Sequence, residues 1–408
     1  MTVSARGWHR LYDTCGAVPV DGAVTGFTAN ADRVIRVDRD RLEHDPRFQR
    51  PGMEEITSRL RQSMDRQEAD EWFMDDVHRY AEIARAFGDE GEIRLGGQAG
   101  IAATHLASRI TRRVAYYTPG APAACRQAMD RSGARPLLPH PSGPPLTPSC
   151  HLVFEYPATG GGRANRFITS PRERWTAPLL PPEAHDDLDG VLSGYTRAFL
   201  SGYQYLEDAD AARTAARELS LLGEHIRTHV ECVALEGRDI RRSFVEQILP
   251  AVHSAGANEM ELRVLLEGAG EQTRAQEIAD GPAGLLEGAL ALHRRIGGRL
   301  HVHTHGYYLA VLDRGITDPA RSRDALLYAA REAVLRAGGG RPGELSAAGR
   351  RAVELVEETA DRVAAAGVCM RDGRWVIAVP TLLAEPAVHT VGLGDVLSST
   401  AFVCDPMV

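Results

Sequence analysis

The sequence contains no lysine, and all 47 basic residues among its 408 are arginine. Without lysine, the chain cannot form a Schiff base or hold a phosphate through an ammonium group. A phosphate site would therefore depend on arginine, backbone amides or a metal ion. Cysteine is also scarce, with six residues and no CxxC pair, which excludes the usual zinc and dithiol motifs.

Long apolar runs and an excess of basic charge are missing as well. No stretch approaches the roughly 18 consecutive apolar residues of a membrane helix, and the first residues contain no apolar core typical of a secretory signal. We therefore expect a cytoplasmic protein without a membrane partner. The net charge of −8 disfavours a nucleic-acid binder. The 43% of hydrophobic residues are enough for a large core, spread over two or three domains of about 150 residues.

Short β-like runs alternate with longer helical stretches through most of the chain. Apolar residues at spacings of three and four predict helices over 324–337 and 347–366. Strands are expected at 23–28, 151–156, 188–192, 227–234, 300–304 and 375–379. This alternation predicts an α/β fold with a mostly parallel sheet flanked by helices. Residues 33–92 are charged, helical in pattern and poor in strand signals, which indicates a smaller inserted domain.

The strongest local signal lies near the C-terminus, where Gly392-Leu393-Gly394-Asp395 precedes a run of small and apolar residues. Glycines allow a tight turn in which consecutive N–H groups point to one spot. At the start of a helix, these amides and the helix dipole attract an anion. Asp395 would lie beside that anion, where it could take a proton from an attacking hydroxyl. The alternative is an ordinary glycine turn with Asp395 as a helix cap.

Two acidic motifs lie upstream of this segment. His229-Val230-Glu231 occurs in an expected strand near its end, and Asn258 and Glu261 open an expected helix. Carboxylates at strand ends and helix starts suit a magnesium ion that keeps most of its waters. The alternatives are a solvated strand end for His229 and Glu231, and a capping box for Asn258 and Glu261.

Polar residues follow the first expected strand and a later glycine pair. Asn30 and Asp32 can point from the sheet edge into a crevice, the expected ligand position in α/β folds. Gly97 and Gln98 precede a helix of small residues, where glycine lets the backbone approach a polar ligand. The alternatives are a polar turn for the first pair and close helix–sheet packing for the second.

In this order, these segments resemble the ADP-dependent glucokinase/phosphofructokinase family, a branch of the ribokinase-like kinases. The matching segments include GFTANAD, LGGQAGIAA, HLVFEYP, RANRFI, HVECVAL, NEMEL, HVHTHGYYLAV and HTVGLGD, and they span Gly26 to Asp395. The ordered set of HxE, NxxE and GxGD is far more specific than any single motif. The resemblance implies a large ribokinase-like domain (1–32, 92–112 and 184–408) and a smaller α+β lid domain (33–91 and 113–183).

The resemblance also implies a role for each matching residue. The catalytic base corresponds to Asp395, and the anion hole to Gly392, Leu393 and Gly394. A residue expected to contact the donor phosphates corresponds to Arg166. Sugar contacts correspond to Asn30, Asp32, Gly97, Gln98 and Asp395 and, in a looser alignment, Glu71. Metal-organising positions correspond to Glu231, Glu261 and Asp395. Nucleotide-binding positions correspond to His303, Val379, Pro380, Val391, Gly394 and Arg166.

The implied reaction uses Mg²⁺ and takes ADP as phosphoryl donor. The β-phosphoryl group would pass to a sugar hydroxyl, and AMP would be released. The implied partners are therefore a small sugar-like acceptor and an adenine nucleotide, bound by a monomer or a small homo-oligomer.

The acceptor remains open at this point. Leu382 follows VPT where the family usually carries a basic residue, and no lysine is present to grip a sugar phosphate. These departures and Glu71 favour an unphosphorylated, glucose-like hexose. One alternative is a sugar phosphate held by Arg163, Arg172 and Arg174. Others are a nucleoside, an intermediate of specialised metabolism, and a binding protein without catalysis.

Overall fold

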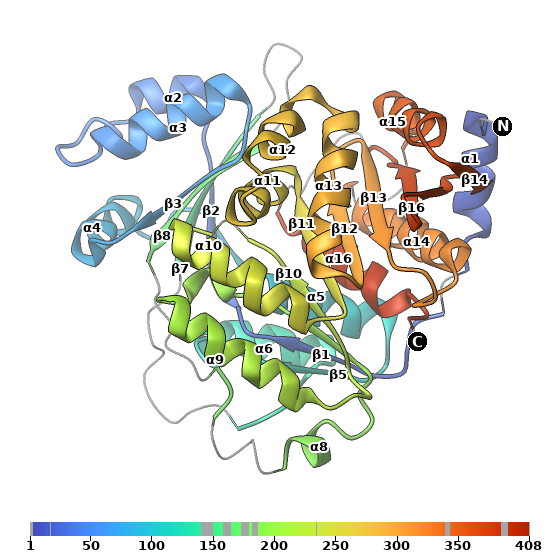
Figure 1. Cartoon of the computed structure of the whole chain (residues 1–408). Coiled ribbons are helices and arrows are strands. Elements are labelled where there is room, and N and C mark those ends of the chain that lie inside the picture. The colour runs from blue at the N-terminus through green and yellow to red at the C-terminus, as the bar shows by residue number, and fades with distance from the viewer. Residues whose placement is uncertain are drawn as a thin grey trace.

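Two β-sheets organise the described part of the chain (Figure 1). The computed structural model describes residues 3–16, 18–139, 150–157, 165–172, 179–181, 187–233, 235–338, 343–384 and 391–407. Within these residues, the larger sheet has eleven strands and the smaller sheet has five. Helices lie on both faces of the larger sheet, so the predicted α/β class is confirmed. Among the described helices, none is long and apolar enough to cross a membrane.

The larger sheet is mostly parallel, as predicted. In spatial order its strands are β14 (Arg362–Ala365), β15 (Val368–Arg371), β16 (Arg374–Pro380), β13 (Tyr307–Leu312), β12 (Arg299–His303), β11 (Ser254–Asn258), β10 (Arg227–Glu231), β9 (Arg197–Leu200), β1 (Ala23–Gly26), β5 (Val114–Tyr117) and β6 (Arg135–Pro136). Pairing is parallel from β12 to β6 and antiparallel from β12 to β14. The parallel strands are buried on both faces because helices cover both sides.

Two helical layers enclose this sheet (Figure 1). One layer contains α1 (Ala5–Thr14), α5 (Gln98–His105), α6 (Ala123–Ser132), α14 (Pro319–Gly338) and α16 (Leu393–Cys404). The other contains α9 (Ala209–Leu219), α10 (Arg238–Ser243), α11 (Glu259–Gly268), α12 (Gln272–Glu277), α13 (Pro282–Ile296) and α15 (Ala347–Glu358). Helix α16 crosses β9 to β12, and its first turn lies at the carboxyl ends of the parallel strands.

The smaller sheet lies largely in the region expected as the lid and is called the lid sheet. Its strands, in spatial order, are β3 (Asp70–Met74), β8 (Asn165–Pro171), β7 (Cys150–Tyr156), β2 (Asn30–Arg36) and β4 (Glu92–Gly96). An apolar cluster that includes Ile35 and Phe154 packs one face against α2 (Arg39–His44), α3 (Glu54–Arg66) and α4 (Val77–Phe87). Side chains alternate along a strand, so Asp32 and its neighbours in register lie on the other face. That face looks toward the large domain, as the ion pair between Arg172 and Glu236 shows.

The strand pairing differs from the expected domain limits. Residues 114–136, expected in the lid, form β5, α6 and β6, because β5 pairs with β1. Residues 30–32 and 92–96, expected in the large domain, belong to β2 and β4 of the smaller sheet. The segment 33–92 also contains more strand than predicted. The strands β3 and β4 are only five residues long and contain acidic residues, which are depleted in strands, so their composition favours other structure.

Two local predictions are wrong. Residues 188–192, expected as a strand, contain the short helix α8 (Leu188–Val191). The helix expected over 347–366 ends at Glu358, and β14 follows it. Short apolar runs fit a strand and a buried helix equally well, so their period alone does not separate the two.

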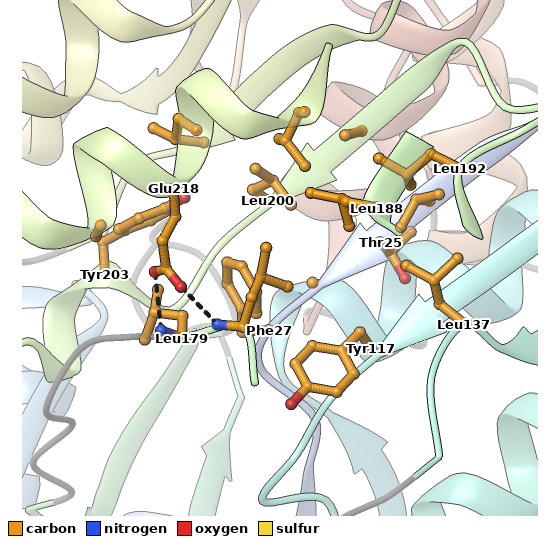
Figure 2. A pocket seen from close by; sticks show the side chains of 17 residues that line it. Thr25, Phe27, Tyr117, Leu137, Leu179, Leu188, Leu192, Leu200, Tyr203 and Glu218 are labelled. Carbon is orange, nitrogen blue, oxygen red and sulfur yellow. Dashed lines mark hydrogen bonds between the residues drawn. The ribbon is translucent and has the colours of Figure 1, made fainter. Parts of the chain in front are cut away.

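A small apolar cavity of about 30 Å³ lies beside β1 and β9. Aromatic side chains such as Phe27, Tyr117 and Tyr203 line it (Figure 2). At its edge, the carboxylate of Glu218 accepts hydrogen bonds from the backbone N–H groups of Leu179 and Leu180, both at 2.8 Å. This buried carboxylate therefore closes the wall of the cavity by pairing two backbone donors.

Replacing Glu218 with alanine is expected to lower the free energy of unfolding by about 2–4 kcal/mol, because two buried N–H groups lose their acceptor. Urea denaturation followed by circular dichroism measures this change. The matched control is Glu224→Ala, since Glu224 is exposed at the end of the same helical region. Equal unfolding midpoints for both variants would contradict the assigned role of Glu218.

Candidate active site

The carboxyl ends of the parallel strands form one wall of the site. Glu231 ends β10, Asn258 ends β11 and His303 ends β12, and these three strands are neighbours. After β1, residues 27–29 lead directly into β2 of the lid sheet. The site therefore lies where the two sheets meet, at the strand ends where α/β folds bind their ligands.

The start of α16 supplies the second wall. Gly392 caps the helix in a left-handed conformation with φ 75°, and Asp395 lies in the first turn. A Cβ atom on Gly394 would lie only 2.8 Å from Cε1 of His303, so the close approach of helix and strand requires glycine there. The predicted glycine turn before a helix is present. Its free N–H groups and the helix dipole attract an anion.

Glu231 is the centre of a buried hydrogen-bond network. Its Oε1 lies 2.9 Å from Nε2 of His303, and its Oε2 lies 3.0 Å from Nε2 of His229. His229 in turn contacts Ser254 Oγ through Nδ1, at 2.8 Å. Burial alone would raise the pKa of Glu231, but hydrogen bonds from the two histidines outweigh it and hold the pKa well below its usual range. Burial would lower the pKa of His303, yet the Glu231 carboxylate raises it to about 9.

Glu261 forms the capping box that the sequence allowed. Its Oε2 accepts the Asn258 N–H at 2.7 Å, and its own N–H donates to Asn258 Oδ1 at 2.9 Å. Burial raises the pKa of Glu261 to about 8, opposed by His303 and reinforced by Glu231. Burial and the charge of Glu231 also raise the pKa of Asp395, to about 6. Carboxyl groups thus crowd this side of the site, and a bound cation would relieve their repulsion.

The donor set fits a magnesium ion held mainly through water. Across the described part of the chain, no three aspartate, glutamate, histidine or cysteine side chains are arranged to ligate one ion directly. Glu231, Glu261 and Asp395 nevertheless interact electrostatically with one another. Mg²⁺ keeps several of its waters and takes few protein ligands, so such a loose group of carboxylates suits it.

The lid sheet forms the opposite wall. Asp32 stands between Arg94 of β4 and His151 of β7 in the strand register. Asn30 donates to Asp32 Oδ1 at 2.5 Å. Burial raises the pKa of Asp32 to about 7, while Asn30 and the charge of Arg166 oppose the rise. His151 lies 3.9 Å from Asp32, and its buried Nε2 has no hydrogen-bond partner among the described residues.

Arg166 on β8 connects the two walls electrostatically. Its positive charge acts on Asp32 and Glu71 of the lid and on Asp395 of α16, and lowers the pKa of each. Glu71 lies on β3, next to β8, where surrounding protein raises the pKa of its carboxyl and Arg166 opposes this rise. Arg166 therefore lies within electrostatic reach of Asp32, Glu71 and Asp395, residues predicted to contact the sugar.

Gly97 and Gln98 join the lid to the start of α5. Gly97 has φ 76°, and a Cβ there would lie 2.7 Å from Cα of Ala29, so this turn requires glycine. Gln98 donates to the backbone carbonyl of Cys232 at 3.3 Å. Its Oε1 is buried without a hydrogen-bond partner in the described residues, which leaves an acceptor for a ligand.

The remaining residues predicted to bind the nucleotide or a phosphate have other surroundings. Val379 is fully buried, and the carbonyl of Pro380 accepts the Tyr12 hydroxyl at 2.6 Å, so both lie beneath the surface of the site. Val391 forms the turn before α16 and is half-buried. Two arginines considered for phosphate binding, Arg163 and Arg174, lie outside the described residues.

Sequence reasoning missed His151, Arg94 and Ser170 on the lid face. Thr169 pairs with Leu152 in the register of β8 and β7, so Ser170 and His151 are the next residues along the two strands. The buried Oγ of Ser170 also lacks a partner among the described residues. The segment HLVFEY gave the only signal, since polar His151 and Glu155 occupy alternate positions of an otherwise apolar strand.

Comparison with known proteins decides the family. The family profile described as "ADP-specific Phosphofructokinase/Glucokinase conserved region" matches residues 49–404, which is most of the chain. The chain belongs to the ADP-dependent phosphofructokinase/glucokinase family. This finding confirms the resemblance drawn from the ordered motifs.

Similar proteins in the ADP-dependent phosphofructokinase/glucokinase family agree with this assignment. The ADP-dependent glucose/glucosamine kinase of Pyrococcus furiosus is 26% identical, covering 97% of this chain and 98% of that protein. The ADP-specific phosphofructokinase of Methanosarcina acetivorans is 25% identical, covering 76% of this chain and 75% of that protein. A solved ADP-dependent kinase in complex with fructose-6-phosphate and ADPβS has a TM-score of 0.82 at 24% identity, covering 99% of this chain and 98% of that one. The protein is therefore an ADP-dependent sugar kinase, a phosphotransferase.

Proposed function

We propose that the chain transfers the β-phosphoryl group of ADP to a hydroxyl of an unphosphorylated, glucose-like hexose and releases AMP, with Mg²⁺ as cofactor. The charge of the lid face carries this proposal. Asp32 and Glu71 lie on the strand face that looks toward the large domain; the charge of Glu71 raises the pKa of Asp32, and Arg166 lowers the pKa of both. Sugar hydroxyls donate hydrogen bonds to carboxylates, whereas a sugar phosphate would be repelled by them.

The ion pairs of Arg172 also support an unphosphorylated acceptor. Its Nε donates to Asp75 Oδ1 at 2.7 Å, and its guanidinium pairs with Glu236 of the large domain at 2.6 Å. A guanidinium already paired with two carboxylates is a poor clamp for a sugar phosphate, because binding would have to displace both partners.

The chemistry follows from the two walls. Asn30, Asp32 and Gln98 would orient the sugar by hydrogen bonds to its hydroxyls. Asp395 would take the proton of the attacking hydroxyl. The N–H groups at the start of α16 and the charge of Arg166 would stabilise the oxygens of the transferred group. Magnesium, when bound, supplies further neutralisation of the phosphate charge, and Glu231 and Glu261 would hold it through water.

The same geometry favours ADP over ATP. The phosphoryl group to be transferred must lie at the start of α16, beside Asp395. Suppose that the adenosine site holds ADP so that its β-phosphate lies at the start of α16. The third phosphate of ATP bound in the same adenosine site would then collide with the helix start or with the acceptor hydroxyl. We therefore expect ATP to be a poor donor even where it binds.

The test is a screen of ADP and ATP against glucose, fructose 6-phosphate and a nucleoside, with AMP and the phosphorylated product both measured. Phosphorylation of glucose by ADP is the expected result. If only fructose 6-phosphate, and not glucose, were phosphorylated, the proposed acceptor would be wrong. Equal rates with ATP and ADP would contradict the proposed donor. No turnover with any pair would overturn the catalytic assignment.

A second acceptor, fructose 6-phosphate, has support in the names of relatives. Several similar proteins are ADP-specific phosphofructokinases, including that of Methanosarcina acetivorans. In this chain the additional arginine on the lid face, Arg94, already pairs with Glu92 at 2.6 Å and with Glu155 at 3.6 Å. The screen separates the two acceptors directly.

Glu71→Gln tests the acidic lid contact. We expect a KM for glucose raised by about tenfold, because the loss of one hydrogen bond to a charged group is worth about that much. The KM for ADP should stay unchanged. The control is Glu68→Gln, because Glu68 is exposed close to the same strand. Equal glucose KM values in the two variants would remove Glu71 from the acceptor site.

Glu261→Gln tests the metal role against the capping role. The amide keeps the shape of the capping box but loses the negative charge. We expect the Mg²⁺ concentration needed for half-maximal rate to rise several-fold, with little change in unfolding temperature. An unchanged Mg²⁺ dependence would show that Glu261 serves only as a helix cap.

A further inference from the structure

Arg336 brings a positive charge to the start of α16, in addition to that of Arg166. It lies in the last turn of α14, the helix that packs along α16. Its Nη2 would lie 3.4 Å from a Cβ on Gly392, the N-cap residue of α16. Arg336 also interacts electrostatically with Asp395 of α16 and with Arg94 of the lid. The guanidinium therefore lies against the turn where an anion is expected.

The guanidinium has few partners of its own. Its Nε is buried and makes no hydrogen bond, and no ion pair joins Arg336 to another described residue. One helical turn earlier on α14, Glu332 pairs with Arg109 at 2.6 Å. The charge of Glu332 is therefore neutralised by another residue of the protein, whereas the charge of Arg336 is not neutralised by an ion pair with a described residue.

The position is electrostatically unusual. The C-terminal end of α14 favours a cation, but the N-terminal end of α16 carries partial positive charge and disfavours one. Arg94 adds repulsion, and burial lowers the pKa of the Arg336 guanidinium. A negative group between Arg336 and the start of α16 would satisfy the guanidinium and the helix amides together.

We propose that Arg336 is a further phosphate-contacting residue, whose guanidinium donates hydrogen bonds to the terminal phosphate of ADP at the start of α16. The inference rests on the proposed function, because it uses the site assigned there to the β-phosphate. It adds a contact from the helical layer behind the Gly392–Asp395 turn, opposite to Arg166 on the lid. The phosphate would then be held by one arginine from each domain.

The test compares ADP with AMP, since only ADP carries the phosphate that Arg336 would touch. Isothermal titration calorimetry of the full chain with Mg²⁺ gives both dissociation constants in the absence of acceptor. In Arg336→Gln we expect the preference for ADP over AMP to fall about tenfold or more, which is the value of one hydrogen bond between charged groups. The Kd for AMP should remain within about twofold. Arg336→Lys should recover part of the preference, because it restores the charge without the fork of donors.

The control is Arg109→Gln, which breaks the ion pair one turn away on α14 without touching Gly392. It should leave the preference for ADP unchanged. A purely structural role for Arg336 would lower the unfolding temperature of Arg336→Gln and leave the ratio of the two Kd values intact, and that result would overturn the inference. If the natural chain itself showed no preference for ADP over AMP, the proposed donor would fail first, which separates the two outcomes.

Discussion

Asp395→Asn is expected to lower kcat by about 10²–10⁴-fold, the usual contribution of a general base, while ADP still binds. The amide keeps the size and the helix position of Asp395 but cannot accept the proton of the attacking hydroxyl. Steady-state assays at saturating substrates give kcat, and calorimetry with ADP gives the Kd. Activity above about a tenth of the unmodified chain would remove Asp395 from this role.

The pH dependence gives an independent check on Asp395. Burial and Glu231 raise its pKa to about 6, so the carboxylate needed as a base is protonated below that pH. The rate of phosphoryl transfer should therefore rise with pH through about 6 and level off above it. Bound Mg²⁺ would favour the ionised form further, so we expect the pH at which the rate rises to be lower in the Mg²⁺-loaded complex than in the free protein. In Asp395→Asn the limb should disappear, and a limb that persists would belong to another group.

Arg166→Gln is expected to lower kcat by about 10³-fold, in line with arginines that neutralise a transferring phosphoryl group. Arg166 is the cation that acts on Asp32, Glu71 and Asp395 together, so its loss also leaves three carboxyl groups facing one another. The acid limb of the rate should accordingly move to higher pH. Arg166→Lys should recover only part of the rate, because an ammonium group cannot make the paired contact of a guanidinium.

The matched control for this series is Arg213→Gln. Arg213 is exposed on α9, where it pairs with Asp210 three residues earlier. Exposed pairs of this kind contribute little to stability, so its kcat and pH profile should match the unmodified chain. An effect of the same size in both variants would mean that the loss in Arg166→Gln is not specific to the site.

The sequence predicted the parts of the site that depend on short spacings. Asp395 at a helix start, the Asn258–Glu261 capping box and Glu231 at a strand end are set by two to four residues of local pattern. Such patterns determine local geometry because a helix turn or a strand end brings near neighbours together.

The parts that depend on distant pairing were not predictable in the same way. His151 meets Asp32 only because β2 and β7 pair in one particular register, although 119 positions separate them in the numbering. Arg336 reaches Gly392 only through the packing of α14 on α16. The lid strand β7 was expected at 151–156, but β3 and β4 were missed, because they are only five residues long and contain acidic residues, which are depleted in strands. The domain limits inferred from the family resemblance therefore placed β4 and β5 in the opposite domains.

The alternation of side chains in the lid strands decides how the acceptor range of this protein can evolve. A shift of β2 by one residue would turn Asp32 toward the helices behind the sheet and bring Ile35 to the cleft. Single-residue insertions inside these strands thus abolish the site, whereas substitutions at every second position change only what the sugar meets. A mutagenesis library confined to positions 30, 32, 71, 151 and 170 would sample new acceptors and leave the apolar layer behind them untouched.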